Sequence, residues 1–420
     1  MIGVKRWDAV VVGAGPAGSA VALTLARQGA TVLLLDRARF PRDKPCSEYL
    51  SPAATPLLER LDPEIVPAIE RTEPGRLYGM RIVAPDGRAA VGRFSRLPDT
   101  LRSRPYGFAV SRTVLDTLVV RGAERAGAVI EEGAQAEDLL YDQGAVGGVV
   151  VRPSGGWPRQ TVRARVVVGA DGLRSVVARR LGLCRRSAPE RLAFTAHFSG
   201  VAEVGDVGEM HVGARAGGGG YVGLGPIGNG VTTTALVLPA AVARRRAPEL
   251  RDSVALVRAL DRFPALRGRF AMARVVRDVL ATGPFAQWTR RSVAPGGGAL
   301  LVGDAADFFD PFTGQGLFSA LRGAELAAAT ISAALAMQAR GPLGASVLAP
   351  YAAARRRAFG GKWILERLIG AGVGWPWLAG RVIARLARYP ALADLLIGAT
   401  GNVVPARTVL APSILFRLLI

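Results

Sequence analysis

The chain has 420 residues and half of them are apolar, so it can bury a large core and is not a disordered protein. Its formal charge is +21, from 54 Lys and Arg against 33 Asp and Glu, but most of the basic residues are scattered arginines, so we expect no nucleic-acid partner. Two distant cysteines, Cys46 and Cys184, and two histidines exclude a disulfide framework and a zinc-type cluster, so we expect no metal; this cysteine usage is typical of a cytoplasmic protein.

The N-terminal segment has the pattern of a strand, a turn, a helix and a second strand. Residues 8–12 (DAVVV) predict a buried strand, 13–18 a turn, 19–28 a helix and 31–35 (TVLLL) the second strand. This order predicts a βαβ unit with parallel strands. The glycines inside the uncharged stretch 9–26 are not expected in a signal peptide or a membrane-spanning helix.

The turn carries a GxGxxG motif directly after a strand. Gly13 permits the tight turn, Gly15 lets a pyrophosphate approach the backbone, and Gly18 allows helix and strand to pack closely. The N-terminus of the helix offers unpaired N–H groups to the phosphates. Asp36 ends the second strand, near the usual position of a carboxylate that binds ribose hydroxyls. Together these features predict a dinucleotide site.

Further elements follow in chain order. The pattern predicts a helix at 114–126, short buried strands at 166–168 and 300–302, and a helix at 316–338. Between about 186 and 280, alternating runs punctuated by glycine predict an antiparallel sheet.

A second GxGxxG, at 223–228, lies inside this alternating region. No helix is predicted after it, and Asn229 and Gly230 predict a hairpin turn, so we do not interpret it as a phosphate loop.

Three more motifs occur in order along the chain. Residues 169–175 (GADGLRS) and 303–306 (GDAA) each follow a predicted strand, and 310–316 (DPFTGQG) come soon after. With these motifs the chain resembles the FAD-dependent oxidoreductases that include para-hydroxybenzoate hydroxylase and the geranylgeranyl reductases. The resemblance covers residues 8–329 in collinear order and implies FAD as the bound cofactor.

The resemblance implies a role for each matching residue. Asp36 would hold the adenosine ribose, and Asp171 and Gly172 would lie near the pyrophosphate. Asp304 would bind ribityl or ribose hydroxyls, and Arg112 would contact the cofactor. The helix after the last motif would direct its positive end at the flavin's pyrimidine edge, where reduction adds negative charge. The expected cofactor-binding residues are Gly13, Gly15, Pro16, Ala17, Gly18, Asp36, Arg37, Arg112, Asp171, Gly172, Gly303, Asp304, Pro311, Gly314, Gln315 and Gly316.

The electron donor is a separate question. Arg37 follows Asp36 directly, a pair that could also accept the 2′-phosphate of NADP, but the later motifs favour FAD in this position. The family normally has no second Rossmann domain for a nicotinamide, and the sequence shows none. NAD(P)H or another reductant would therefore reduce the flavin in a transient encounter.

The motifs are compatible with two reactions, the reduction of C=C bonds and hydroxylation. Residues 40–46 (FPRDKPC) resemble the loop that passes the flavin in geranylgeranyl-reductase-like proteins, although 47–52 depart from the glycine-rich continuation usual there. The Trp-x-Trp-x-Ile-Pro signature of the flavin tryptophan halogenases is absent. We expect reduction of C=C bonds in a small hydrophobic substrate, of isoprenoid, quinone or polyketide-like type. The alternative is a hydroxylase of the same fold that uses NAD(P)H and O₂.

Both reactions leave the main chemistry to the cofactor, so the protein need not supply a nucleophile or a metal. A reductase still needs a proton donor. Cys46 and Tyr221 are the catalytic candidates, and Glu48 and His211 are further candidates for proton delivery or substrate contact. The alternative for Cys46 is a small residue packed by the cofactor, and for His211 it is a place in the sheet.

The expected fold is an α/β Rossmann-type FAD-binding domain with an antiparallel-sheet substrate domain and a helical C-terminal extension. We place the first part of the FAD-binding domain at 1–185, the substrate domain at 186–280, the last part of the FAD-binding domain at 281–345 and the extension at 346–420.

The C-terminal segment concentrates the positive charge. Residues 351–420 hold ten Lys and Arg and two acidic residues. Arg381, Arg385 and Arg388 fall on one helical face, and the opposite face is apolar, with Trp375 and Trp377 just before it. This pattern predicts peripheral contact with the inner face of an anionic membrane, or a cap on the substrate domain with its arginines in water.

Overall fold

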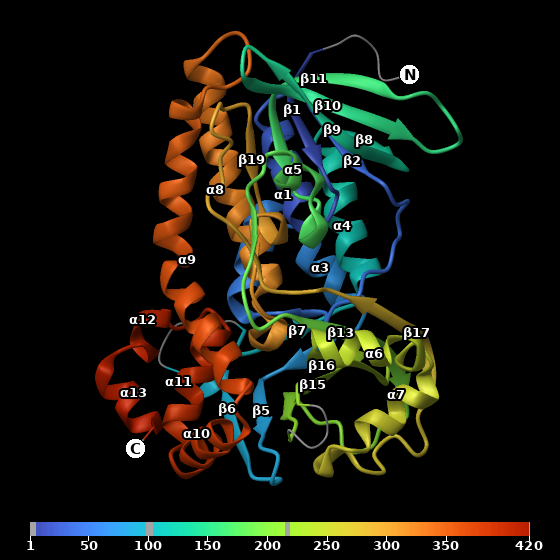
Figure 1. Cartoon of the computed structure of the whole chain (residues 1–420), viewed down its shortest axis with the longest axis vertical. Coiled ribbons are helices and arrows are strands. Elements are labelled where there is room, and N and C mark those ends of the chain that lie inside the picture. Colours follow the sequence, from blue (N-terminus) through green and yellow to red (C-terminus); the bar gives the residue numbers. More distant parts are fainter. Residues whose placement is uncertain (1–5, 98–103, 215–218, 420) are drawn as a thin grey trace.

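The computed structural model describes residues 6–97, 104–214 and 219–419, and its upper half in Figure 1 is built on a seven-stranded sheet. The strand order is β8-β2-β1-β11-β10-β9, with β19 beside β11; β9 and β10 are antiparallel additions to an otherwise parallel sheet. The predicted strands all form, and β11 is much longer than expected. The strands are β1 (Trp7–Val12), β2 (Val32–Asp36), β8 (Val129–Glu132), β9 (Ala134–Asp142), β10 (Ala145–Pro153), β11 (Gln160–Gly169) and β19 (Ala299–Leu301).

Helices α1 (Pro16–Arg27), α4 (Arg112–Arg125) and α8 (Gly316–Met337) pack together against this sheet. Helix α1 starts three residues before the predicted position, because proline is well suited to the first helical turn. Within the described part of the chain, only α8 is long and apolar enough to cross a membrane, but it packs between α1 and α9 (Ala345–Val373). The short helix α5 (Val176–Arg180) follows β11.

A second seven-stranded sheet forms the lower half, in the order β17-β13-β16-β15-β14-β5-β6. The hairpin predicted at Asn229 and Gly230 joins β15 and β16, so the second GxGxxG lies in a strand and not in a phosphate loop. Strands β5 and β6 come from inside the range 1–185, which the sequence assigns to the FAD-binding domain, and both lie in this second sheet. The strands are β5 (Gly79–Val83), β6 (Ala89–Arg93), β13 (Arg191–Ser199), β14 (Gly208–Val212), β15 (Tyr221–Gly228), β16 (Val231–Pro239) and β17 (Arg274–Thr282).

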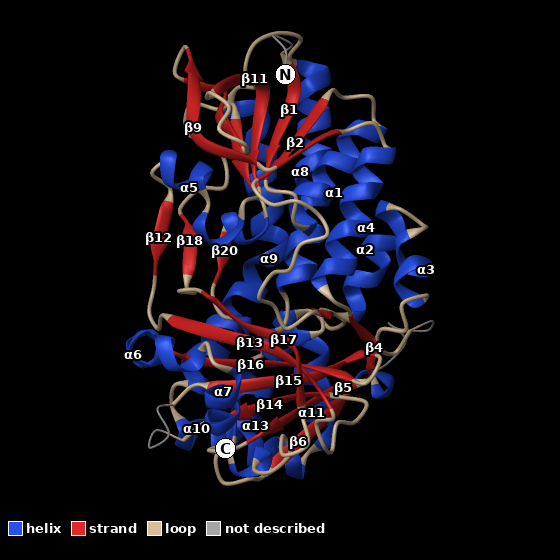
Figure 2. Cartoon of the chain, turned by 90° about the vertical axis from the view of Figure 1, so that its right-hand side faces the viewer, coloured by secondary structure: helices blue, strands red, loops and turns tan. Residues whose placement is uncertain are grey.

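Smaller elements join and cover the two sheets (Figure 2). One three-stranded ribbon runs between the halves and contains β12 (Cys184–Arg186), β18 (Gln287–Thr289) and β20 (Asp307–Phe308). Another contains β3 (Tyr49–Leu50), β7 (Gly107–Ala109) and β4 (Gly75–Leu77). The remaining helices before the extension are α2 (Thr55–Leu61), α3 (Ile65–Glu70), α6 (Ala240–Leu250) and α7 (Ser253–Leu260).

The C-terminal extension packs on the second sheet. Helix α9 runs along the length of the molecule into the lower half (Figure 1). Helix α11 covers the edge strand β6, where Asp394 Oδ1 accepts a 2.7 Å hydrogen bond from the backbone N–H of Arg93. The apolar residues Ile383 and Leu386 of α10 are buried in the core that the extension shares with this sheet. These helices are α10 (Pro376–Arg388), α11 (Pro390–Thr400), α12 (Ala406–Val409) and α13 (Pro412–Leu419).

A buried charge cluster ties β14 to the loop before β17. Both carboxylate oxygens of Glu209 accept hydrogen bonds from Arg269, at 2.8 and 2.9 Å, and Nε2 of His211 lies 2.9 Å from Oε2. Burial opposes the charged carboxylate, but the hydrogen bonds from Arg269 and His211 lower the pKa of Glu209 to about 2. His211 is therefore part of a structural cluster at the sheet.

We expect Glu209→Gln to destabilise the protein by about 3 kcal/mol near pH 7, because it removes the charged partner of a buried arginine. The folded-state pKa is below the ordinary value of 4.5, so this contribution is complete above pH 4.5 and is lost as the pH falls towards 2. Urea unfolding of both proteins across this pH range measures the difference. If the difference in unfolding free energy between wild type and Glu209→Gln does not change with pH, the prediction is wrong. Glu64→Gln, at an exposed position, serves as the control.

Candidate active site

A cavity lies between the two halves of the molecule. We call it the main cavity. Its walls come from the GxGxxG turn, the loop before β3, the segment from Gly303 to the start of α8, and strands β13 and β16. Twelve sequence-predicted residues line it: Gly15, Pro16, Ala17, Cys46, Arg112, Gly172, Gly303, Asp304, Pro311, Gly314, Gln315 and Gly316.

The GxGxxG turn has the geometry that a pyrophosphate requires. A Cβ on Gly18 would lie 1.9 Å from the carbonyl oxygen of Gly13, so only glycine allows this packing. A Cβ on Gly15, in contrast, would have only an Arg42 atom within 4 Å, so the backbone is open towards the cavity. No side chain caps the start of α1, which leaves its first N–H groups for a ligand.

Asp36 holds this turn in place. Its carboxylate is buried and accepts hydrogen bonds from the backbone N–H groups of Ala14 and Ala38, both at 2.8 Å. It does not line the main cavity, and neither do Gly13 and Gly18, which form the turn itself.

Two other expected cofactor residues lie outside the main cavity. The side chain of Arg37 is exposed. The carboxylate of Asp171 accepts a 2.6 Å hydrogen bond from the N–H of Val176 and so holds the start of α5. Burial raises the pKa of Asp171. The sequence pattern placed both residues close to the right loops, but it could not show which way their side chains point.

Arg112 belongs to a buried charge network that the sequence analysis only partly found. It makes two hydrogen bonds, at 2.7 and 2.8 Å, with Asp116 one helical turn later, and Arg42 lies 3.1 Å from the same carboxylate. Burial works against the guanidinium, but Asp116 and then Cys46 raise the pKa of Arg112 above its ordinary value. The i, i+4 spacing of an arginine and an aspartate was the available signal for Asp116.

The start of α8 forms the opposite wall of the main cavity. Gly314 has a left-handed backbone conformation, with φ of 65°, and no side chain caps the helix. Two buried polar atoms there, Gln315 Oε1 and Ser319 Oγ, have no hydrogen-bond partner. Nζ of Lys44, a residue that the sequence analysis missed, lies 3.7 Å from the Asp304 carboxylate. Free helix N-termini on two walls, together with unpartnered polar atoms, fit a dinucleotide cofactor.

A second, smaller and more apolar cavity adjoins the main one, and we call it the side chamber. The two share Ser47, Tyr49, Ala235, Val237, Pro311 and Gly314 as wall residues. Apolar side chains of the second sheet and β4 form much of the rest of the chamber, among them Leu77, Met80, Met210 and Leu224.

Tyr221 lines the side chamber and is fully buried. Its hydroxyl donates a 2.6 Å hydrogen bond to Asp310, which also pairs with Arg191 and accepts from the N–H of Phe312 at 2.9 Å. Burial and then the Asp310 carboxylate raise the pKa of Tyr221 well above its ordinary value. Tyr221 therefore keeps its proton and donates it in the hydrogen bond to the Asp310 carboxylate.

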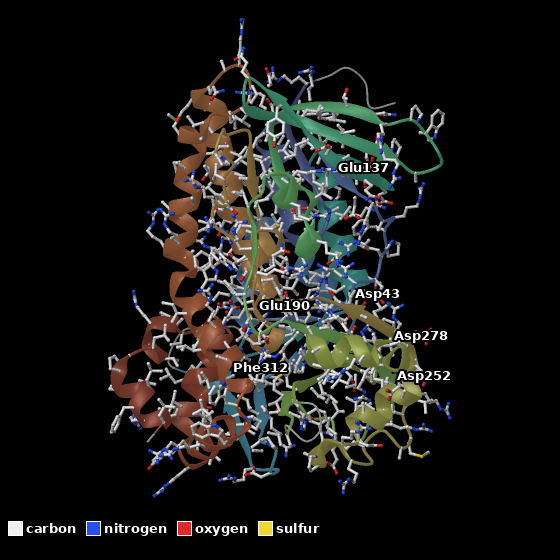
Figure 3. The ribbon with its side chains drawn as sticks, viewed as in Figure 1. Asp43, Glu137, Glu190, Asp252, Asp278 and Phe312 are labelled. Carbon is white, nitrogen blue, oxygen red and sulfur yellow. The ribbon has the colours of Figure 1, made fainter. Side chains whose placement is uncertain are left out.

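Cys46 and Glu48 lie on the same loop but in different surroundings. The Cys46 sulfur faces the main cavity and accepts a 3.3 Å hydrogen bond from the N–H of Glu48. Glu48 is fully buried behind the cavity wall, with a carboxylate oxygen 2.8 Å from Nε2 of His197, close enough for an ion pair but not aligned as a hydrogen bond. Arg277 lies 3.8 Å from the Glu48 carboxylate and also pairs with Asp43, marked in Figure 3.

One further pair from the C-terminal extension reaches the main cavity. Nζ of Lys362 lies 2.8 Å from Glu366, and both residues line the wall beside Thr313. Burial raises the pKa of Glu366. The sequence analysis did not find this pair, because α9 lies far along the chain from the cofactor motifs.

Comparison with known proteins agrees with this geometry. Residues 6–362 match the family model of an FAD binding domain. Digeranylgeranylglycerophospholipid reductase from Methanothrix thermoacetophila is 30% identical over 79% of this chain and 78% of its own length. The enzyme of that name from Methanocella arvoryzae is 28% identical over 85% of this chain and 84% of its own.

Solved structures show the same fold. A geranylgeranyl bacteriochlorophyll reductase-like protein from Thermoplasma acidophilum has a TM-score of 0.79 with 20% identity, covering 99% of both chains. The flavin-dependent brominase Bmp2 has a TM-score of 0.77 with 21% identity, covering 95% of this chain and 94% of its own. The chain belongs to the family defined by this FAD-binding domain, and it is an FAD-dependent oxidoreductase.

Proposed function

We propose that this oxidoreductase saturates C=C bonds of an isoprenoid lipid. The observation that carries the proposal is the apolar side chamber, which adjoins the cofactor cavity and shares Tyr49, Ala235 and Val237 with it. A chamber of this kind accepts a flexible apolar chain and keeps water away from it. The relatives named as lipid reductases support the same substrate class.

Bound FAD, once reduced, supplies the hydride that such a saturation needs, with NAD(P)H as the proposed electron donor. The protein has to provide the accompanying proton and the orientation of the substrate. Tyr221 is held by Asp310 and shapes the chamber. Cys46 lines the main cavity, as Arg112 does, so its thiol is placed where a substrate beside the cofactor could take a proton from it. We assign proton delivery to Cys46 on this basis.

The reaction type is tested by reducing the FAD-bound protein with dithionite in the absence of oxygen and then adding a geranylgeranyl lipid. We expect the yellow flavin absorbance to return at a rate that rises with lipid concentration, and mass spectrometry to show the lipid two mass units heavier for each bond reduced. If the lipid has no effect and reoxidation needs O₂, with an oxygen atom added to the product, the protein is the hydroxylase instead.

The role of Cys46 is tested by Cys46→Ala. We expect the rate of lipid-dependent flavin reoxidation to fall about a hundredfold, the usual size of a lost proton donor, while FAD content and lipid binding stay close to wild type. Cys184→Ala is the matched control, because Cys184 is the other free cysteine and lies outside the main cavity. A Cys46→Ala rate within about twofold of wild type would assign the residue a packing role.

We also propose that the extension contacts an anionic membrane, from which a lipid substrate would come. The apolar face of α10 is occupied by the core, so the contact would be made by exposed aromatic residues of the extension, namely Trp375 and Trp377 at the start of α10 and Phe416 in α13. The exposed Arg381 and Arg388 lie on the same helical segment as the two tryptophans.

Membrane contact is measured by sedimenting the full chain with phosphatidylglycerol vesicles. We expect Trp375→Ser/Trp377→Ser to reduce the bound fraction severalfold, because both indole rings lose their place at the lipid interface. Trp157→Ser, at an equally exposed tryptophan of the upper half, should bind as wild type does. Equal sedimentation of all three proteins would contradict contact through this segment.

A further inference from the structure

A third cavity, on the outer side of α9, carries a concentration of positive charge that the FAD site does not use. It lies between α9 and residues 288–295. We call it the arginine groove. Its wall contains five arginines and a single carboxylate, and the arginines are Arg290, Arg291, Arg355, Arg356 and Arg367.

Most of this charge has no counter-charge within the protein. Arg355 is buried and pairs with Asp307 at 2.7 Å. In the described residues, no carboxylate lies within 4 Å of the other four guanidinium groups, all of which are exposed. Four uncompensated arginines in one hollow favour an anion, since guanidinium groups form strong, charge-assisted hydrogen bonds with phosphate oxygens.

Aromatic rings line the same hollow. The Arg367 guanidinium stacks 4.7 Å from the ring of Phe309 and 5.9 Å from that of Trp288. Trp363 lines the groove as well, and Arg355 lies 5.6 Å from its ring. A wall of this composition offers a flat apolar surface beside the cationic one.

Two buried donors in this wall lack an acceptor. Nε of Arg355 and Nε1 of Trp363 are enclosed and form no hydrogen bond. Buried N–H groups are rarely left unpaired in a folded protein, so the hydrogen bonding of this wall is incomplete. The groove also shares Asp307 and Phe309 with the main cavity, so a ligand in it would be next to the FAD site.

We propose that the arginine groove is a second binding site, for a ligand that carries a phosphate or diphosphate group together with an apolar or aromatic portion. A soluble nucleotide such as the electron donor and a phospholipid headgroup share this chemistry. The binding itself does not depend on the proposed reduction of lipids. Only the assignment of a bound nucleotide as the hydride donor rests on that function.

The test uses the full chain saturated with FAD, so that the adenosine site of the main cavity is occupied. Isothermal titration calorimetry measures the binding of ADP, inorganic diphosphate and dihexanoyl phosphatidic acid below its micelle concentration. The variant Arg290→Gln/Arg367→Gln removes two exposed charges of the groove, and Arg245→Gln/Arg251→Gln removes two exposed charges on and just after α6. Retained FAD and an unchanged melting temperature show that each variant is folded.

We expect at least one probe to bind with a Kd that rises about thirtyfold or more in the groove variant and less than twofold in the control. Tighter binding of ADP than of phosphatidic acid identifies a nucleotide site, and the reverse order identifies a headgroup site. Absence of binding by all three probes at millimolar concentration overturns the proposal, and so does equal binding by the groove variant, the control and the wild type. Either negative result leaves FAD binding and lipid reduction to be judged by their own measurements.

Discussion

The buried carboxylate of Asp310 joins three parts of the chain at the point where the two cavities meet. It pairs with Arg191 of β13, accepts from Tyr221 of β15 and caps the turn that leads into α8 through the N–H of Phe312. Arg191 extends the connection by donating to the carbonyl oxygen of Gly370 in α9, at 2.8 Å. This ion pair therefore connects the second sheet and the extension to the cofactor motif at 310–316, together with the hydrogen bonds of Thr313 with Glu366 and of Gln315 with the carbonyl of Ala399.

Other buried ion pairs lie around the two cavities. Arg112 with Asp116, Glu209 with Arg269, and Lys362 with Glu366 are ion pairs buried at the walls of the two cavities. Each pair costs desolvation free energy and is retained only where its geometry satisfies both partners. Such pairs fix the direction of the chain segments that meet there. They leave the apolar side chamber free of charges other than Glu209, whose charge is neutralised by Arg269.

The parts of the fold that are local in sequence could be predicted. Periodicity and turn chemistry predict the βαβ unit, the long helix α8 and the hairpin at Asn229. The glycine pattern of the first turn is equally local, because Gly18 packs directly against the backbone of Gly13. The parts that depend on distant partners could not. Strand β5 takes its place by pairing with β14, and β6 by pairing with β5. Asp310 contacts Arg191 and Tyr221, which lie far away in sequence, and Glu366, the partner of Lys362, contacts Thr313 of the cofactor motif. Side-chain direction explains why Arg37 and Asp171 lie outside the main cavity although neighbouring residues of their motifs line it.

The central claim is that an isoprenoid chain occupies the side chamber next to the FAD site. A crystal structure of the protein with FAD and a non-reactive, saturated prenyl phospholipid tests it most directly. We expect the prenyl chain to lie between Leu77, Met210 and Leu224 and to enter the main cavity past Tyr49. A chain bound elsewhere on the molecule, with the side chamber closed or filled by protein side chains, would contradict it.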